Sequence, residues 1–223
     1  EDGTGRRENI TDWALARFRA AYGDETIGKW DIFHSVYGLL HHPAYRARYA
    51  ENLKRELPRL PLVEGADAFR ACATIGEQLL RLHLGYESAA EWPGLRSIET
   101  PANGPDGRVS FHVEKLRLTP DKSAVVVNPT LTLAGIPQEA FTYRLGNRSA
   151  LDWVIDQYRT TTDARSGIAS DPNRPDDPQY IVRLLGQVIT VSMETVRLVE
   201  RLAAVALPVT PDAVDVSVMA KGE

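Results

Sequence analysis

The spacing of apolar residues changes once along the chain, and this change constrains the fold more than any other feature. Over residues 11–84 the apolar side chains recur three or four positions apart, as they do on one face of a helix. From residue 109 they alternate with polar side chains, which is typical of a half-buried strand. The pattern therefore predicts an α+β protein: an N-terminal helical bundle followed by a mixed β-sheet domain with flanking helices.

Four helices are expected in the first part. Thr11 is a candidate N-cap, Gly23 ends the first helix, and Pro43 is well placed as the first residue of the third. A fourth helix is expected over residues 66–84, with Cys72 on its inward face. The expected buried stripes of the first three helices are Leu15, Phe18 and Tyr22, then Trp30, Phe33, Tyr37 and Leu40, then Tyr45, Tyr49, Leu53 and Leu57.

Strands are expected at residues 109–113, 124–127, 131–133 and 141–145. Ser149 with Asp152 three positions later predicts a capping box and a helix, in which Trp153 is expected to be a core residue. A polar loop is expected over residues 163–178. A long final helix then begins at Pro178, with Gly186 as a candidate break.

These elements predict four segments along the chain. Residues 1–62 form a helical unit, residues 63–108 a helix and a linker, residues 109–207 an α+β core, and residues 208–223 a C-terminal tail. The chain opens at Glu1 without an initiator methionine, so we expect it to be part of a longer polypeptide.

Composition narrows the class of protein. The chain has 223 residues, of which 43% are hydrophobic and 25% charged, as in an average soluble domain. There is no membrane-spanning apolar run and no secretory signal, and a single cysteine excludes an internal disulfide. These features predict a cytoplasmic location and no membrane partner. The net charge of −4 disfavours a globally basic nucleic-acid binder but not a local basic face.

The usual catalytic signatures are missing from the sequence. It has no phosphate-binding P-loop, no dinucleotide-binding glycine turn and no nucleophile elbow. His41 and His42 are adjacent, so on a helix they point about 100° apart and cannot hold one metal ion together. We therefore expect a chain that binds rather than catalyses, with no catalytic residue, metal site or cofactor of its own.

Several runs of residues together resemble a known family, over about 70% of the chain. In the C-terminal half they are Leu131–Pro137, Leu145–Val154, Tyr158–Asp163, Arg165–Ile168, Asp171–Asn173, Tyr180–Val182 and Val188–Thr195; in the N-terminal half they are Ile10–Asp12, Phe33–His41 and Tyr45–Tyr49. The sequence is similar to the C-terminal specificity domain, or target recognition domain, of type ISP restriction–modification enzymes. Ser35 departs from the family pattern, at a position where an aromatic residue is expected.

The resemblance implies a function for the chain and for a parent polypeptide. The chain would be the sequence-specific double-stranded DNA recognition module of an enzyme used in phage defence. The parent would also carry a nuclease, an ATP-driven translocase and an adenine-N6 DNA methyltransferase. S-adenosylmethionine, ATP and Mg²⁺ would be needed by those upstream parts. Residues 1–62 would link to the upstream methyltransferase.

Two loop regions and one turn supply the candidate DNA contacts, because recognition needs phosphate contacts for register and base-edge contacts for sequence. The candidates are Lys122, Ser123, Arg144, Asn147, Arg148, Arg159, Thr160, Thr162, Arg165 and Ser166. A secondary basic cluster is Arg46, Arg48, Lys54 and Arg55.

Alternatives remain open for these residues. Arg148 could pair with Asp152 or Asp156, and Arg165 with Asp163 or Asp171. The secondary cluster could be a solvated face or a contact with the methyltransferase. For the whole chain, the alternative function is a protein-docking or scaffolding domain that packs on the methyltransferase without reading DNA.

Overall fold

The computed structural model describes residues 9–100, 109–208 and 213–215, and the chain divides into two compact units. The first unit is Glu1–Arg81 with Arg197–Glu223, and the second is Leu82–Val196. Parts of the segments predicted at 63–108 and 208–223 lie outside the described residues, and the four-segment division remains a prediction. No described helix combines the length and the apolarity needed to cross a membrane.

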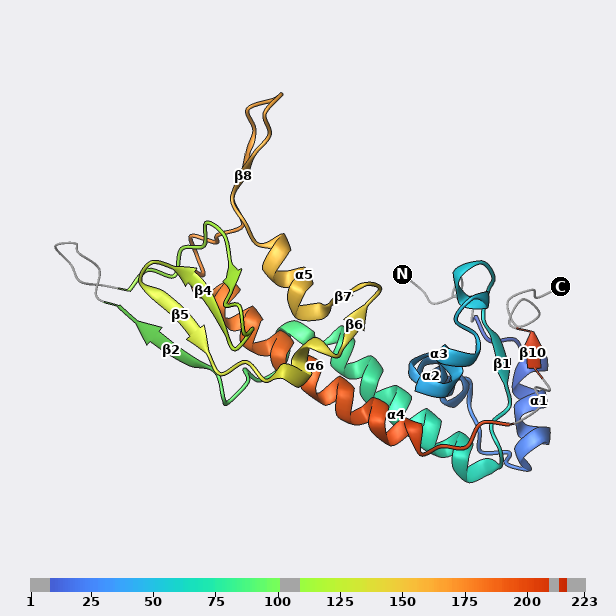
Figure 1. Ribbon diagram of the computed structural model, residues 1–223. Helices are drawn as coiled ribbons and strands as arrows, with labels where there is room; N and C mark the ends of the chain where they lie inside the picture. The colour runs from blue at the N-terminus through green and yellow to red at the C-terminus, as the bar shows by residue number, and fades with distance from the viewer. Residues whose placement is uncertain (1–8, 101–108, 209–212, 216–223) are drawn as a thin grey trace. The chain divides into compact units, whose positions relative to one another are not determined.

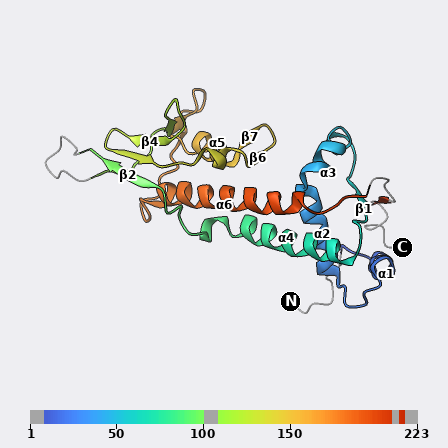
Figure 2. The same cartoon turned by 60° about the horizontal axis from the view of Figure 1, so that its bottom comes forward.

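The first unit is mainly helical (Figure 1). Its elements are α1 (Asp12–Tyr22), α2 (Lys29–His41), α3 (Pro43–Arg48), the short 3-10 helix η1 (Asn52–Lys54), β1 (Arg59–Pro61) and β10 (Ala213–Asp215), which pairs antiparallel with β1. Two long helices are divided between the units: α4 (Ala66–Leu84) belongs mainly to the first unit, and α6 (Tyr180–Ala203) belongs mainly to the second (Figures 1 and 2).

The second unit is built on a four-stranded sheet in the order β2-β5-β4-β3. Its elements in chain order are η2 (Tyr86–Ser88), β2 (Arg96–Glu99), β3 (Arg117–Leu118), β4 (Ala124–Asn128), β5 (Leu131–Ala134), η3 (Gln138–Phe141), β6 (Arg144–Leu145), β7 (Arg148–Ser149), α5 (Ala150–Gln157), β8 (Thr161–Thr162) and β9 (Ala169–Ser170). The α+β class is confirmed. Every ladder between the described strands is antiparallel, where the sequence analysis expected a mixed sheet.

Helix α1 begins and ends at the residues that the sequence predicts. The Thr11 hydroxyl accepts a hydrogen bond from the Ala14 amide at 3.2 Å, which satisfies one of the free N–H groups of the first turn. Gly23 stops the helix in the left-handed conformation, with φ of 62°. α4 has the predicted bounds, so the first and fourth predicted helices are confirmed.

The buried face of α2 differs from the predicted stripe. Trp30 and Phe33 are exposed, and the helix instead buries Ile32, Ser35, Gly38 and Leu39. The reason is the close approach of α2 to α4: a Cβ atom on Gly38 would lie 2.6 Å from the Cys72 carbonyl oxygen. Small side chains let the two backbones touch, so the aromatic side of α2 turns outward. Sequence spacing found the helix but selected the wrong face.

The third helix is shorter than predicted. α3 ends at Arg48, because the following residues turn through η1 towards β1, and Leu57 is 70% exposed. The His42 ring fixes the start of α3, where its Nδ1 atom accepts from the Ala44 amide at 3.2 Å. The fully buried Tyr45 donates its hydroxyl to the Arg59 carbonyl oxygen at 2.8 Å, which joins α3 to β1.

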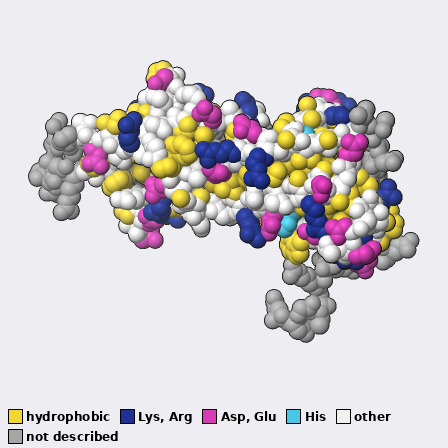
Figure 3. Space-filling model, turned by 90° about the horizontal axis from the view of Figure 1, so that it is seen from below, with side chains coloured by type: hydrophobic (Ala, Val, Ile, Leu, Met, Phe, Trp, Pro, Cys, Tyr) yellow, Lys and Arg dark blue, Asp and Glu magenta, His cyan; other side chains and the backbone are white. Residues whose placement is uncertain are grey.

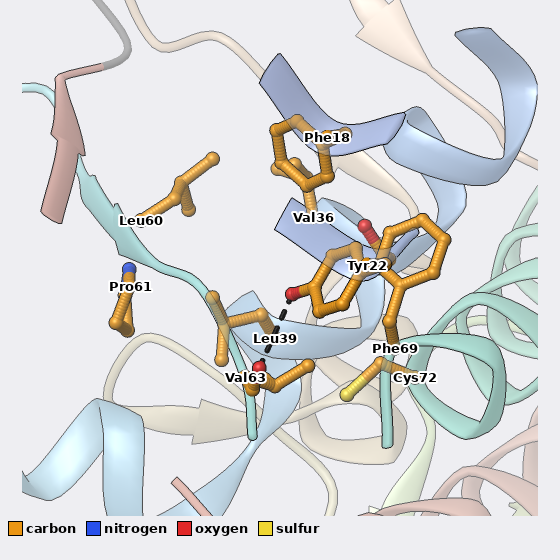
Figure 4. Close-up of a pocket in the computed structure, with 10 residues that line it drawn as sticks. Phe18, Tyr22, Val36, Leu39, Leu60, Pro61, Val63, Phe69 and Cys72 are labelled. Atoms are coloured by element: carbon orange, nitrogen blue, oxygen red, sulfur yellow. Dashed lines mark hydrogen bonds between the residues drawn. The ribbon is translucent and has the colours of Figure 1, made fainter. Parts of the chain in front are cut away.

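Aromatic side chains fill the core of the first unit (Figure 4). The Tyr22 ring stacks on Phe69 with ring centroids 4.7 Å apart, and Phe18 packs on the same ring at 5.7 Å. The Tyr22 hydroxyl donates to the Val63 carbonyl oxygen at 3.3 Å. Burial raises the pKa of the neighbouring Cys72 thiol to about 11, so this side chain acts as a core residue rather than a reactive thiol.

Acid should weaken the first unit through Asp24. Its carboxylate accepts hydrogen bonds from Thr26 and from the Arg70 guanidinium, which together lower its pKa to about 2. Because the unfolded value is near 4, the stabilisation is present above pH 4 and is lost as the pH falls from about 4 towards 2. In urea titrations, Asp24→Asn should lower the unfolding midpoint at pH 6 and reduce its dependence on pH. The control Glu64→Gln should keep the wild-type dependence, and an equally steep acid response in Asp24→Asn would contradict this account.

The predicted strand at residues 109–113 is wrong, although its alternating burial is present. Val113 is fully buried and Ser110 and His112 are exposed, but none of the strands that the structure describes pairs with this segment. Side chains replace the missing strand: the Asn128 amide donates to the Ser110 and His112 carbonyl oxygens at 2.7 and 3.0 Å. Asn173 accepts from the Val113 amide at 2.8 Å and donates to its carbonyl oxygen at 2.9 Å.

Asn173→Ala should therefore destabilise the second unit. The substitution leaves the amide of the buried Val113 without its partner, and an unpaired buried group of this kind costs about 1–3 kcal/mol; the Val113 carbonyl oxygen loses one of two donors and keeps the Thr160 hydroxyl at 3.3 Å. Chemical denaturation should detect this loss, while Gln157→Ala, at an exposed position on α5, should change the free energy of unfolding by less than about 0.5 kcal/mol. Equal stabilities of the two variants would contradict the assignment.

The core of the second unit lies between the sheet and α6, which runs along one face of the sheet (Figures 1 and 2). The strands predicted at 124–127 and 131–133 are confirmed as β4 and β5, but residues 141–143 are not strand, because η3 ends at Phe141 and a turn leads from it into β6. α6 is continuous through Gly186, which does not break it. Gly186 instead lets the Glu91 side chain approach, since an added Cβ would lie 3.1 Å from the Glu91 Cβ.

Candidate nucleic-acid interface

Two short hairpins flank α5 and carry most of the candidate residues. The first hairpin joins β6 to β7, and Leu145 pairs with Arg148 across its turn. Gly146 takes the left-handed conformation that this tight turn requires, with φ of 69°. The Arg144 guanidinium donates to the Asn147 carbonyl oxygen, so Arg144 and Asn147 lie together at the end of the hairpin.

The Arg148 side chain does not cap the N-terminus of α5. The capping box occupies that end: the Ser149 hydroxyl accepts from the Asp152 amide at 3.0 Å, and the Asp152 carboxylate accepts from Ser149. The predicted capping box is confirmed. The Arg148 side chain instead lies along α5, with its guanidinium 5.4 Å from the centroid of the Trp153 ring.

Asp156 brings two of the candidate arginines together. Its carboxylate accepts from Arg148 at 2.9 Å and lies 3.4 Å from the Arg159 guanidinium. The alternative in which Arg148 pairs with Asp156 is therefore present in the structure. The hydrogen bond from Arg148 and the charge of Arg159 lower the pKa of Asp156, with a smaller contribution from Lys115.

Trp153 is a surface residue, which corrects the prediction that it belongs to the core. It is 44% exposed, and its indole N–H donates to the Leu145 carbonyl oxygen at 3.2 Å. The helical spacing indicates one inward face, but α5 has only eight residues and Leu151 occupies the centre of that face. Trp153 therefore lies beside the β6–β7 hairpin, where it contacts the Leu145 backbone and the Arg148 guanidinium.

The second hairpin, Thr161–Ser170, extends away from the sheet beyond the end of α5 (Figure 1). Every residue of it is exposed, including the 69% exposed Ile168. The Asp163 carboxylate holds the turn by accepting from the Arg165 and Ser166 amides at 3.0 and 2.7 Å. In the polar loop predicted over residues 163–178, residues 169–170 instead form β9 and pair with β8.

Arg165 lies in the turn of this hairpin. Within the ranges that the structure describes, its guanidinium forms no ion pair, so the predicted alternatives with Asp163 and Asp171 are not formed. Thr162 lies on β8, and Ser166 lies in the turn beside Arg165. Thr160 anchors the base of the hairpin, because its amide donates to the Glu114 carbonyl oxygen at 2.8 Å.

Lys122 and Ser123 lie in a separate turn between β3 and β4. Lys122 has φ of 57°, a conformation that costs most side chains about 1–2 kcal/mol. Asp121 stabilises the turn by accepting from the Thr119 and Ser123 hydroxyls at 2.6 and 2.7 Å. These bonds hold the pKa of Asp121 near 2. The Lys122 ammonium lies 5.0 Å from the centroid of the Phe141 ring.

The secondary basic cluster belongs to the first unit, on and after α3. Arg48 donates to the Pro208 carbonyl oxygen at 2.7 Å, and Lys54 pairs with Glu51 at 2.7 Å. Arg46 and Arg55 are exposed. Figure 3 shows basic and acidic side chains interspersed on the face in view, rather than one broad basic surface.

The sequence analysis missed an apolar groove in the second unit. Its volume is about 270 Å³, and the His83 and Tyr143 rings stack in its lining with centroids 5.3 Å apart. The His83 ring also forms a hydrogen bond with the Thr195 hydroxyl at 2.9 Å. These residues come from α4, α6 and the segment before β6, so no local spacing could have joined them. The described part of the chain contains no cluster of His, Cys, Asp or Glu side chains suited to a metal ion.

Comparison with known proteins identifies relatives of this fold. The sequence profile of the type ISP C-terminal specificity domain matches residues 1–184. No curated protein sequence matches the chain. Among solved structures, a nuclease-deletion mutant of the type ISP restriction–modification enzyme LlaGI, in complex with a DNA substrate mimic, is 40% identical. It aligns over 82% of this chain and 14% of its own, with a TM-score of 0.69.

Two further structures are similar. The ATP-dependent type ISP restriction–modification enzyme LlaBIII bound to DNA is 30% identical, with a TM-score of 0.77, over 93% of this chain and 13% of its own. The DrdV–DNA complex is 40% identical, with a TM-score of 0.77, over 91% of this chain and 20% of its own. The present chain thus spans one fifth or less of the length of these relatives. With its sequence profile and its fold in agreement, the chain belongs to the type ISP C-terminal specificity domain family.

Proposed function

We propose that this chain is the sequence-specific double-stranded DNA recognition module of a restriction–modification enzyme. The observation that carries the proposal is the exposed hairpin Thr161–Ser170, with Arg165 in its turn and Arg148 and Arg159 at its base. The relatives LlaGI, LlaBIII and DrdV, whose structures contain DNA or a DNA mimic, support it.

The proposed division of labour follows from groove geometry. A two-stranded β-ribbon fits the major groove, which is about 12 Å wide and displays a different donor and acceptor pattern for each base pair. Arg165 is proposed to reach a base edge there, with Thr162 and Ser166 as neighbouring donors. Arg148, Arg159 and Thr160 at the base of the hairpin are proposed to contact phosphates, which fix the register.

The β6–β7 hairpin and the β3–β4 turn are further proposed contacts. Arg144 and Asn147 present side chains at an exposed hairpin end, and Lys122 and Ser123 lie in a rigid turn. Phosphate contacts of this kind carry no sequence information, so these four residues are proposed to contribute affinity to all duplexes.

The parent polypeptide is proposed to supply the chemistry. The relatives are five to eight times longer than the matched region, which supports a parent with nuclease, ATP-driven translocase and adenine-N6 methyltransferase parts upstream. S-adenosylmethionine, ATP and Mg²⁺ are proposed to bind to those parts, in a cytoplasmic enzyme of phage defence. No catalytic role is proposed for the described residues.

A docking role for residues 1–62 is a second proposal. Trp13 and Trp30 are 51% and 61% exposed, and Phe33 is also exposed. Large aromatic side chains on a surface are typical of protein interfaces. They support packing of this helical unit, together with the basic cluster Arg46, Arg48, Lys54 and Arg55, on the upstream methyltransferase.

Fluorescence anisotropy with a labelled duplex at increasing salt tests the proposal. The full 223-residue chain should bind at low salt, and the logarithm of its affinity should fall linearly with the logarithm of the salt concentration. The slope should be about −0.9 for each phosphate contacted. Failure to bind at low salt would overturn DNA recognition by this chain and leave the docking role.

A further inference from the structure

The base of the Thr161–Ser170 hairpin holds two arginine side chains around one carboxylate, and the charge of Lys115 acts on the same carboxylate. Arg148 and Arg159 both contact Asp156, and the backbone of Lys115 forms an isolated β-bridge with that of Arg159. The side chains of Arg148, Arg159 and Asp156 are each 45–48% exposed, so solvent and ligands can reach the ion pairs. The cluster therefore carries a net positive charge on an open surface.

Contacts within the domain position the Arg148 guanidinium in the absence of DNA. Its guanidinium lies over the Trp153 ring and ends at the Asp156 carboxylate, and the Trp153 indole is itself held by the Leu145 carbonyl oxygen. A carboxylate and a phosphate present the same kind of oxygen acceptors to a guanidinium. Asp156 thus occupies the position relative to the two arginines that a DNA phosphate would take.

We propose that the Asp156 carboxylate competes with a DNA phosphate for Arg148 and Arg159, and so holds down the affinity of the domain for DNA of any sequence. This inference rests on the proposed function. A phosphate must displace Asp156 from the arginines or bind beside its negative charge. Either event reduces the binding free energy that the phosphate–arginine contact contributes. Base reading by Arg165 does not involve Asp156, so the carboxylate weakens the binding of all sequences by the same factor.

Asp156→Asn tests the proposal, because it removes the charge and keeps the size of the side chain. The variant should bind a labelled duplex of arbitrary sequence about 3–10-fold more tightly at 0.1 M salt, and its salt slope should be steeper by about one unit. Asp176→Asn is the matched control: Asp176 is an exposed carboxylate in the same unit, in the loop before α6. It makes the same change in net charge, and we expect less than a twofold effect.

The same substitution in a variant that lacks both arginines tests whether the effect depends on them. When Arg148→Ala and Arg159→Ala are already present, Asp156→Asn should give no gain in affinity. A gain that persists there, or one matched by Asp176→Asn, would overturn the proposal, as would an unchanged affinity of Asp156→Asn in a wild-type background that binds DNA. Loss of preference at a single base pair without a gain in affinity would also overturn it, since Asp156 would then read a base. Failure of the wild-type chain to bind would instead overturn the proposed function.

Discussion

Gly76→Ala is expected to destabilise the first unit by at least about 2–3 kcal/mol, although alanine favours helix more than glycine does by about 1 kcal/mol. A Cβ atom at position 76 would lie 1.8 Å from the His34 carbonyl oxygen and 2.8 Å from the Gly38 amide nitrogen. Both neighbours are backbone atoms of α2, so no side chain can rotate to make room. The two helices must separate, which opens the core around Cys72 and Ile75.

Thermal and urea unfolding measure this effect. Thr74→Ala, at an exposed position of the same helix, is the control and should leave the free energy of unfolding within about 0.5 kcal/mol or raise it slightly. Gly38→Ala should resemble Gly76→Ala, because its Cβ would lie 2.6 Å from the Cys72 carbonyl oxygen. A Gly76→Ala variant that is more stable than wild type would show that α2 and α4 do not touch as described.

Arg165→Ala is expected to lose about 1–3 kcal/mol of DNA-binding free energy and to relax the sequence preference at one base pair. Its side chain projects from a hairpin that makes no buried contact, and no described ion pair must be broken before it can reach a base. Because nothing in the fold depends on this side chain, the variant should unfold at the wild-type temperature.

The contrast with other arginines makes the result informative. Arg148→Ala should weaken the binding of all sequences alike and lower the salt slope by about one unit, as expected for a phosphate contact. Arg81→Ala, on α4 and paired with Glu77, removes one positive charge elsewhere and should leave sequence preference unchanged. If Arg165→Ala and Arg148→Ala both retained wild-type affinity and preference, the proposed DNA surface would be wrong.

The sequence predicted those elements whose signals are local. The Thr11 and Ser149 caps, the bounds of α4 and the strands β4 and β5 follow from capping chemistry and residue spacing within about ten positions. The exposed face of α2 did not follow, because it depends on the contact of Gly38 with a helix that begins 28 residues later. The strand predicted at 109–113 failed because Asn173, 60 residues away in sequence, takes the place of a strand partner.

The candidate site shows the same division. Residue type and turn composition selected Arg148, Arg159 and Arg165, but not their arrangement. Arg148 and Arg159 lie before and after α5, and they meet at Asp156 only because the helix has the length that it has in the structure. The exposure of Trp153 depends on the β6–β7 hairpin. The groove lined by His83 and Tyr143 gives no signal in the sequence, because its residues come from distant segments.

Selection of bound DNA from a pool of randomised duplexes, followed by sequencing, tests the central claim most directly. The full chain should enrich one asymmetric site at low salt, and Arg165→Ala should lose the preference at one position of that site. A bound fraction with the same sequence composition as the starting pool would contradict sequence recognition by this chain.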